Sequence, residues 1–152
     1  MPGRASPPQA EALAAARFGL TVDGVEVGQF SELSGIKTEV EVVELMETDG
    51  DKLFLKRLPG RRSPPTVTLK RGLSQDMSLS AWHQSVVEGL IAAARKSCTL
   101  TAYDAGGVAV AKYSLQSAWP SKLEISGLKA GASEVLYETV TLTCEDIQRV
   151  AP

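Results

Sequence analysis

Six of the chain's 16 lysine and arginine residues fall within residues 55–72, which read LKRLPGRRSPPTVTLKRG. The six cations are Lys56, Arg57, Arg61, Arg62, Lys70 and Arg71. Clustered cations neutralise phosphate groups and release counterions, so they are typical of nucleic-acid-binding surfaces. One hypothesis for the chain is therefore a nucleic-acid-binding β-barrel that uses residues 55–72 as its groove.

Three features of the sequence weaken this hypothesis. The stretch contains no aromatic side chain on which a base could stack, and the 152-residue chain has a net charge of −2. An acidic block directly precedes the basic one, and it consists of Glu39, Glu41, Glu44, Glu47, Asp49 and Asp51. Acidic groups beside the basic stretch oppose the binding of phosphate.

Few residues could form a catalytic or metal site. His83 is the single histidine, and the motifs GxSxG, HExxH and GxxxxGK with a following Ser or Thr are missing from the sequence. Glu138 shares a strand face with apolar residues, which predicts a place near the exposed start of that strand or a salt bridge to a neighbour. We predict no catalytic residue, no cofactor and no metal site. A small-ligand-binding barrel or an enzyme is a further alternative, and it requires a buried pocket with convergent polar groups.

The two cysteines, Cys98 and Cys144, lie 46 residues apart without a CxxC spacing. One interpretation is two small buried apolar side chains in a reduced compartment. The other is a single disulfide that joins two strands.

The adjacent acidic and basic blocks suggest a contact between copies of the chain. If both blocks flank a protruding loop, one copy cannot easily pair them internally, whereas the acidic surface of one copy can face the basic surface of the next. Such a heterologous contact closes into rings or propagates as fibres. Edge-to-edge pairing around a ring would also cover free strand edges. The alternative is two solvated faces of a monomer.

The surrounding pattern predicts a β-rich domain. Residues 1–17 are expected to form a separate arm that is flexible or becomes ordered on assembly, and residues 18–152 the β domain. Asp23-Gly24 lies between two β-rich runs and predicts a tight hairpin. Alternation over residues 36–45 predicts a half-buried strand, with Ile36, Thr38, Val40 and Val42 on one face. A break at 49–51, the run LFLKR and a basic Pro/Gly-rich loop should then lead to a strand TVTLKR.

In one stretch of the second half of the chain, the spacing of the apolar residues changes from that of a strand to that of a helix. Apolar residues recur at helical spacing in residues 78–96, where Asp76 or Ser78 can cap the start of a helix. Strands are expected in CTLTAYD, VAVAKYSL, SAWPSKLEI and SEVLYETVTLTCED, with a turn at 105–107 and a loop at 127–131. The total of seven or eight strands and one main helix predicts a mainly β fold, an antiparallel sandwich or barrel with one flanking α-helix.

Several motifs, taken in order, resemble a known family. VDGVEVGQFSELSGI, LPGR followed by TLKRG, and AWP are similar to the tail tube proteins of contractile phage tails and phage-like contractile injection systems. The resemblance covers about residues 18–148. It implies a β-sandwich or barrel with a flanking helix, which forms hexameric rings that stack into a hollow inner tube. It implies no enzymatic residue.

The resemblance also implies where subunits meet. The segment from about Glu44 to Pro65 resembles the extended loop through which family members contact neighbouring subunits. The expected interface residues are Glu44, Glu47, Asp49, Asp51, Lys56, Arg57, Arg61 and Arg62. The Ala-rich arm and the turn RRSPP depart from the usual pattern, and the arm leaves open a main tube subunit or a specialised ring near the baseplate.

The resemblance finally implies partners. These are other copies of the chain, a contractile sheath around the tube, baseplate or spike and terminator proteins, and cargo in the lumen. We expect no specific nucleic acid and no stable membrane insertion before firing. Because no export signal and no run of 18 apolar residues occurs, we expect assembly in the cytoplasm into a particle that is retained or released. A phage tail and a host-encoded injection system both fit.

Overall fold

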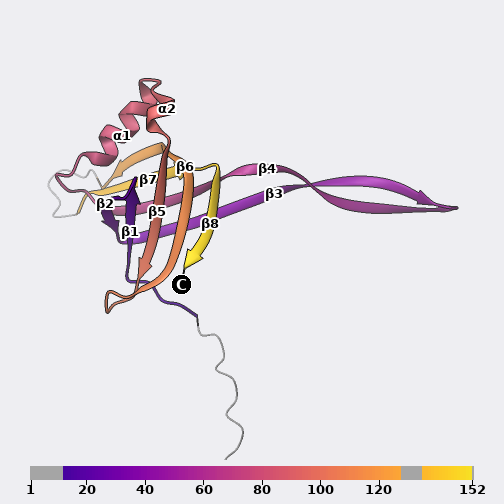
Figure 1. Ribbon diagram of the computed structural model, residues 1–152, viewed down its shortest axis with the longest axis horizontal. Coiled ribbons are helices and arrows are strands. Elements are labelled where there is room, and N and C mark those ends of the chain that lie inside the picture. The colour runs from indigo at the N-terminus through magenta and orange to yellow at the C-terminus, as the bar shows by residue number, and fades with distance from the viewer. Residues whose placement is uncertain (1–11, 128–134, 152) are drawn as a thin grey trace, which may run out of the picture.

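The computed structural model describes residues 12–127 and 135–151, and it contains eight strands and two short helices in these ranges (Figure 1). The strands are β1 (Arg17–Val22), β2 (Val25–Phe30), β3 (Glu32–Asp49), β4 (Lys52–Gly72), β5 (Lys96–Tyr103), β6 (Ala109–Ser126), β7 (Tyr137–Thr143) and β8 (Asp146–Ala151). The helices are α1 (Ser78–Val87) and α2 (Ile91–Ala94). Most of the predicted arm and of the loop at 127–131 lies outside the described residues.

The strands form one antiparallel path in the order β2-β1-β5-β6-β7-β4-β3, and β8 pairs with β6. Strand β6 links two layers, because its first part pairs with β5 and β8 and its second part, residues 119–126, pairs with β7. Ser117 has a positive φ of 50° just before this change of partner. Two runs that the sequence separated, VAVAKYSL and SAWPSKLEI, are thus one long bent strand. The predicted mainly β, antiparallel architecture with a flanking helix is confirmed.

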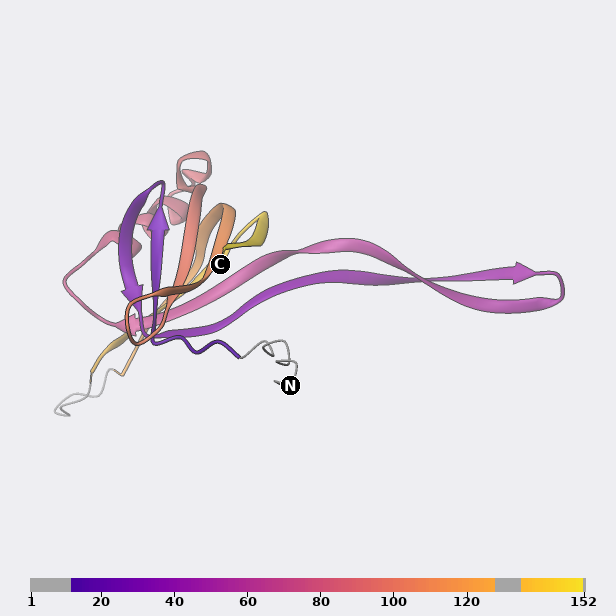
Figure 2. The same cartoon turned by 60° about the horizontal axis from the view of Figure 1, so that its bottom comes forward.

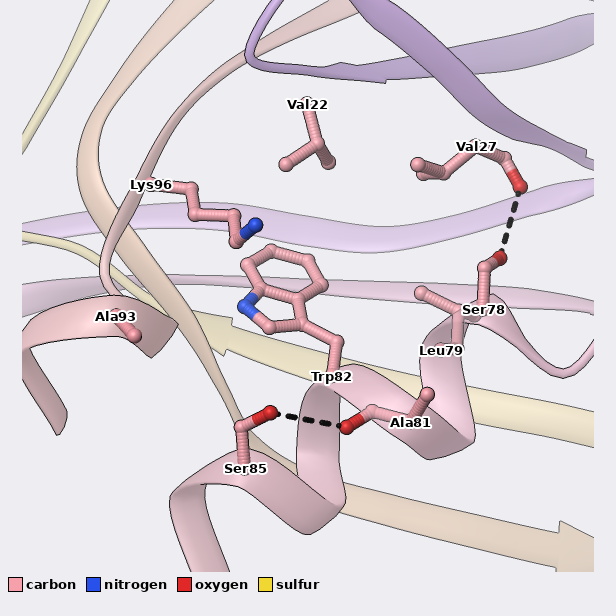
Figure 3. Close-up of a pocket in the computed structure, with 9 residues that line it drawn as sticks. All are labelled: Val22, Val27, Ser78, Leu79, Ala81, Trp82, Ser85, Ala93 and Lys96. Atoms are coloured by element: carbon pink, nitrogen blue, oxygen red, sulfur yellow. Dashed lines mark hydrogen bonds between the residues drawn. The ribbon is translucent and has the colours of Figure 1, made fainter. Parts of the chain in front are cut away.

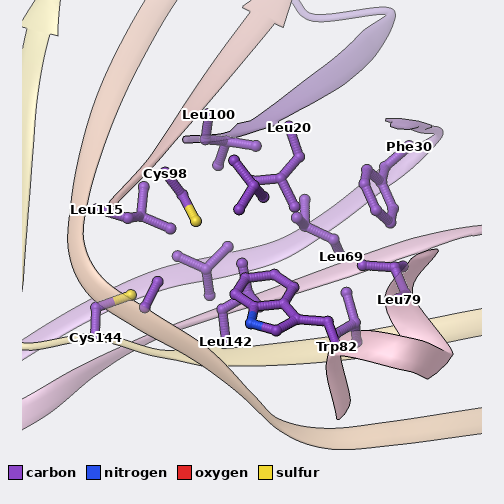
Figure 4. Packing of buried hydrophobic residues seen from close by; sticks show 14 of the residues in the cluster. Leu20, Phe30, Leu69, Leu79, Trp82, Cys98, Leu100, Leu115, Leu142 and Cys144 are labelled. Atoms are coloured by element: carbon purple, nitrogen blue, oxygen red, sulfur yellow. The ribbon is translucent and has the colours of Figure 1, made fainter. Parts of the chain in front are cut away.

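The hydrophobic core lies between the layers and below α1. Leu20, Leu69, Leu100, Leu115 and Leu142 come from five different strands, and each is at most 1% exposed (Figure 4). Alternate residues of each strand supply these side chains, as the period-2 pattern requires. Burial of the apolar residues from both layers holds the sandwich together.

The predicted helix over 78–96 is shorter and interrupted. Asp76 accepts a hydrogen bond from the backbone N–H of Ser78 at 3.0 Å, which satisfies one of the free donors at the start of α1. Gly89 has a φ of +82° and ends the first helix, because this backbone conformation is not helical. The indole N–H of Trp82 donates to the carbonyl of Ala94 at 2.6 Å and ties α1 to α2.

The segment predicted as a basic loop is a strand. β4 runs without interruption from Lys52 to Gly72 and pairs with β3 from Glu32 opposite Lys70 to Asp49 opposite Lys52. The turn at Gly50 joins the two strands, so residues 32–72 form one long hairpin. Pro59 and Pro64 fit into it because the outer part of β4 pairs on one side only, and a proline without an N–H is tolerated on such an edge. The register between β3 and β4 shifts at three places, which is typical of β-bulges, and the two strands remain paired on both sides of each shift.

A buried ion pair joins β4 to β7. Arg71 and Glu138 are 6% and 2% exposed, and the guanidinium donates to Glu138 Oε1 from Nε at 3.2 Å and from Nη2 at 3.1 Å. The Arg71 guanidinium also lies 5.1 Å from the ring centre of Phe30, and a side chain at Gly28 would collide with it. The salt-bridge interpretation of Glu138 is therefore confirmed, and a place at an exposed strand start is wrong.

We expect Glu138→Leu to lower the free energy of unfolding by about 3 kcal/mol, because the buried Arg71 charge loses its hydrogen-bonded partner and keeps only the more exposed Asp76 carboxylate, 3.7 Å from Arg71 Nη1. The double variant Arg71→Met with Glu138→Leu should recover much of this loss, since it removes both charges. Urea unfolding followed by circular dichroism would measure both values. Equal destabilisation by the single and double variants would show that the charge pairing contributes nothing.

The cysteines are two buried free thiols, so the disulfide alternative is wrong. Burial raises the pKa of Cys98 and of Cys144 to about 12, and for Cys98 the neighbouring Cys144 adds to the effect. A thiol with such a pKa carries almost no thiolate at neutral pH, and the thiolate is the reactive form.

We therefore expect both thiols of the native chain to react slowly with an aromatic disulfide reagent at pH 8. In 6 M guanidinium chloride both should react at the rate of an ordinary exposed cysteine, whose pKa is about 8.5. The release of the coloured thiolate gives the two rates directly. Fast labelling of either cysteine without denaturant would contradict the buried placement.

Candidate subunit interface

The long hairpin of β3 and β4 extends far beyond the sandwich in both views of the molecule (Figures 1 and 2). We call residues 40–62 the projecting hairpin. All of its residues are exposed except Glu47, which is half-buried. Backbone pairing of β4 with β7 begins only at Thr66, so no third strand among the described residues pairs with the hairpin beyond its base.

The projecting hairpin exposes nine large apolar side chains. They are Val40, Val42, Val43, Leu45, Met46, Leu53, Phe54, Leu55 and Leu58, and they are 39–68% exposed. The prediction that strand 36–45 is half-buried is thus wrong beyond Ile36, because no layer formed by residues 12–127 and 135–151 covers the outer part of this strand. The alternating pattern signals burial but cannot reveal which chain provides the cover. Large exposed apolar side chains that gather on one element in this way indicate an interaction site.

The charged residues that were expected at the interface all lie on this hairpin, but several are paired within one copy. Arg57 Nε lies 3.6 Å from Glu44 Oε1, and Lys56 Nζ lies 3.5 Å from Glu47 Oε2. Arg62 at the base of the hairpin binds Asp146 of β8. The argument that one copy cannot pair the two blocks internally is wrong for these residues, because the hairpin turn brings the acidic and basic strands side by side.

The remaining expected residues occupy the tip and one side of the hairpin. Asp49 lies opposite Lys52, Asp51 belongs to the turn, and Arg61 lies on the exposed strand beside the register shift at Val40 and Val42. These three side chains are solvent-exposed, and an ion pair at such a site contributes little to the stability of one copy. They are available to a partner.

The basic stretch does not form a cationic groove. Five of its six cations have an acidic partner in the same chain, and the partners of Lys56, Arg57, Arg62, Lys70 and Arg71 are Glu47, Glu44, Asp146, Glu32 and Glu138. Arg71 is buried. A surface that attracts phosphate needs unpaired cations and stacking platforms, so this arrangement disfavours nucleic-acid binding.

The cavity beside α1 lacks the features of a catalytic site. It measures about 450 Å³ and is walled mainly by apolar side chains such as Val22, Val27 and Trp82 (Figure 3). The hydroxyls of Ser78 and Ser85 on its wall bond to backbone carbonyls, and Lys96 pairs with Asp23 at 3.8 Å. No convergent set of free polar groups results.

The single histidine also has a structural contact. His83 on α1 donates from Nδ1 to the carbonyl of Pro120 at 2.9 Å and so fixes the helix against β6. Within residues 12–127 and 135–151, no group of three or more His, Cys, Asp or Glu side chains could hold a metal ion. The helices found in these ranges are also too short or too polar to cross a bilayer.

The contact between Arg62 and Asp146 has a measurable signature. The hydrogen bond from Arg62 lowers the pKa of Asp146, and the Arg62 charge adds to this effect. We expect Arg62→Gln to raise the pKa of Asp146 towards the value of an exposed aspartate, whereas Arg61→Gln leaves it unchanged. Carboxyl carbon chemical shifts followed over an acid titration report this pKa. An unchanged pKa in Arg62→Gln would contradict the tie between hairpin and β8.

Comparison with solved structures identifies the same architecture elsewhere. The cap of the anti-feeding prophage (AFP tube terminating cap) gives a TM-score of 0.75 at 19% identity, over 100% of both chains. The sheath-tube complex of PVC, an extracellular contractile injection system, gives 0.74 at 19% identity over 93% of both chains. The PVC sheath/tube terminator gives 0.73 at 20% identity, over 93% of this chain and 99% of the other. These likenesses show a common fold.

Sequence comparison identifies the family. No curated protein gives a significant match to the chain. The family described as T4-like virus tail tube protein gp19 matches residues 14–148, which include both layers of the sandwich and the entire projecting hairpin. The match confirms the family resemblance of the sequence motifs, and the chain therefore belongs to the T4-like virus tail tube protein family.

Proposed function

We propose that the chain is the structural subunit of the inner tube of a contractile injection apparatus, and that it assembles into hexameric rings which stack into a hollow conduit. The tube would be driven through a target envelope when a surrounding sheath contracts. The observation that carries this proposal is the projecting hairpin, which exposes nine apolar residues in a chain of the tail tube family.

Two free strand edges support ring closure. Within the described residues, β3 pairs only with β4, and residues 119–126 of β6 pair only with β7. Because every neighbouring pair from β6 through β7 and β4 to β3 is antiparallel, these two edge strands run in opposite directions. A copy placed head to tail would bring its β6 edge antiparallel to β3 of the next copy, so backbone pairing can continue around a ring.

The projecting hairpin supports contacts beyond the immediate edge. It carries the eight charged residues expected at a subunit surface, which are Glu44, Glu47, Asp49, Asp51, Lys56, Arg57, Arg61 and Arg62. Its two strands extend away from the body of the molecule (Figure 2), and its nine large apolar side chains are exposed. An apolar surface that one copy cannot cover becomes stable when another copy covers it.

The solved relatives indicate the partners that we propose. Their titles name a tube with its sheath, a tube-terminating cap, a sheath/tube terminator and a sixfold-symmetrised baseplate. By analogy this chain would contact a contractile sheath, baseplate or spike proteins and a terminator, and its lumen would carry cargo. We propose assembly in the cytoplasm, without a catalytic role, in a phage tail or a released injection particle.

Assembly of the purified chain tests this function. Negative-stain microscopy should show rings, and tubes at high protein concentration or with sheath and baseplate proteins added. A chain that stays monomeric under all of these conditions would exclude a tube role. Binding of duplex or single-stranded DNA with a steep salt dependence would instead favour the nucleic-acid-binding alternative.

We expect Arg61→Glu with Arg62→Glu to reduce ring stacking or assembly while the β-rich circular dichroism spectrum stays unchanged. Charge reversal places two carboxylates on a surface that a neighbouring copy would cover, and uncompensated charges there cost free energy. Because Arg62 also binds Asp146, Arg61→Glu alone is the cleaner variant. Arg62→Gln is the control for loss of the contact with Asp146, because it removes the positive charge of Arg62 without introducing a negative one. Normal assembly of the double variant would exclude an interface role for these arginines.

A further inference from the structure

One face of the layer formed by β3, β4, β7 and the second part of β6 points away from the core and is polar. On its other face Val67, Leu69, Val140 and Leu142 are fully buried. Because successive residues of a strand alternate between faces, the residues between them lie on the polar side. We call this side the hydroxyl face, since it carries Thr66, Thr68, Ser121, Thr139, Thr141 and Thr143, which are half-buried or exposed.

The hydroxyls of this face bond across neighbouring strands. Thr68 Oγ1 and Thr141 Oγ1 lie 3.3 Å apart between β4 and β7. Thr143 donates to Ser121 Oγ at 2.8 Å, and Ser121 donates to the carbonyl of Thr141 at 3.2 Å. Each hydroxyl oxygen has two acceptor lone pairs. The face can therefore still bond to water or to a polar group that replaces water.

The charges on the hydroxyl face are balanced. Each of three lysines has a glutamate near its Nζ, and the distances to the carboxylate are 3.7 Å for Lys70 and Glu32, 3.5 Å for Lys122 and Glu124, and 3.4 Å for Lys37 and Glu39. These three positive and three negative charges cancel. A surface without net charge neither concentrates nor expels molecules of one charge sign.

Ring closure would turn the hydroxyl face inward. The free edges of β3 and of the second part of β6 belong to this layer, so pairing between copies closes the layer into a barrel. The opposite face of the layer is covered by the core, by the other layer and by α1 (Figure 1). A closed ring has less room inside than outside. The covered side of each copy must therefore lie outside, and the bare hydroxyl face inside.

We propose that the hydroxyl face lines the lumen as a surface without net charge, and that the lumen holds polypeptide cargo of either charge sign rather than nucleic acid. This inference rests on the proposed tube function, which supplies the closed ring. Hydroxyls can replace the water that hydrates peptide groups and polar side chains. Single-stranded nucleic acid instead binds to positively charged grooves with open aromatic rings. Here Lys70 Nζ lies 4.4 Å from the centre of the Tyr137 ring and occupies a side on which a base would stack.

Thiol labelling tests where the hydroxyl face lies. Thr139→Cys places a thiol opposite Lys70 on one side and Glu124 on the other. Ser80→Cys places one at an exposed position of α1 as a control. The two native thiols are buried and give little background. A maleimide on a dextran wider than the lumen should label both variants as unassembled chains, but in tubes it should label Ser80→Cys alone.

Charged methanethiosulfonates measure the potential at Thr139→Cys in tubes. At about 10 mM salt, where charges act over about 30 Å, the trimethylammonium and sulfonate reagents should react within about twofold of each other, relative to a free thiol. Adding Lys122→Gln leaves Glu124 without its partner and should favour the cationic reagent roughly fivefold or more. The matched control Lys112→Gln lies in the part of β6 that pairs with β5, in the other layer, and should leave the ratio unchanged.

Retention of cargo tests the class of molecule. Tubes are assembled with one of two fluorescent polypeptides of equal length and opposite net charge, or with single-stranded DNA of similar length, and are then separated by gel filtration. The two polypeptides should be retained within about twofold of each other, and DNA less, because no positive surface offsets its self-repulsion. Preferential retention of DNA, or of one polypeptide, would overturn the inference.

The outcomes separate this inference from the proposed function. If the wild-type chain forms no rings or tubes, the proposed function fails and the inference fails with it. If tubes form but the dextran reagent labels Thr139→Cys in them, the tube function stands and the hydroxyl face does not line the lumen. A strong preference of Thr139→Cys for one charged reagent in tubes would show that the lumen surface carries net charge, and the inference would again be wrong.

Discussion

The molecule depends on the continuous backbone pairing of β3 with β4, because β4 passes through two different environments. Its inner part lies between β3 and β7, and there it contributes Val67 and Leu69 to the core. Its outer part has β3 as its only backbone partner among the described residues. Backbone N–H and C=O groups must be paired or hydrated, so this one ladder allows an extended structure to exist outside the sandwich.

Side-chain contacts hold the inner end of β4 in addition to its backbone pairing with β3 and β7. Arg71 is enclosed by Glu138 and by the ring of Phe30, and Gly28 leaves room for its guanidinium. Arg62 binds β8 at the base of the projecting hairpin. These contacts fix the direction in which the hairpin leaves the body, which matters for a subunit whose partners must find it in one orientation.

The projecting hairpin is held by side-chain contacts at its base and exposes apolar residues beyond it. This combination fits a protein whose apolar residues become buried when copies assemble. In the isolated chain the hairpin exposes side chains that a monomeric protein would normally bury. The ion pairs of Arg57 with Glu44 and of Lys56 with Glu47 are complete within one hairpin, so these charges do not need counter-charges from a second copy. A tube that withstands contraction of a sheath benefits from many apolar contacts between copies, because each is individually weak and together they are strong.

The sequence by itself determined the class of the protein. The motif order around VDGVEVGQFSELSGI identified the tail tube family, alternation predicted the β-rich sandwich, and Asp23-Gly24 predicted the first hairpin, since positive φ at both positions is rare outside such turns. The lack of catalytic motifs was also readable there. Local chemistry sufficed for the strands and the first hairpin because each depends on residues close together in the chain, and the family followed from the order of the motifs.

Only the tertiary structure decided how the basic stretch is used. Prolines and glycines suggested a loop, but pairing with β3 made residues 55–65 a strand, because long-range backbone pairing overrides local preference at an edge. The partners of Glu138, Arg57 and Lys56 lie on other strands, so their pairing required the register. Burial likewise depends on what lies opposite: the same alternation marks a core strand in β7 and an exposed apolar ribbon in β3.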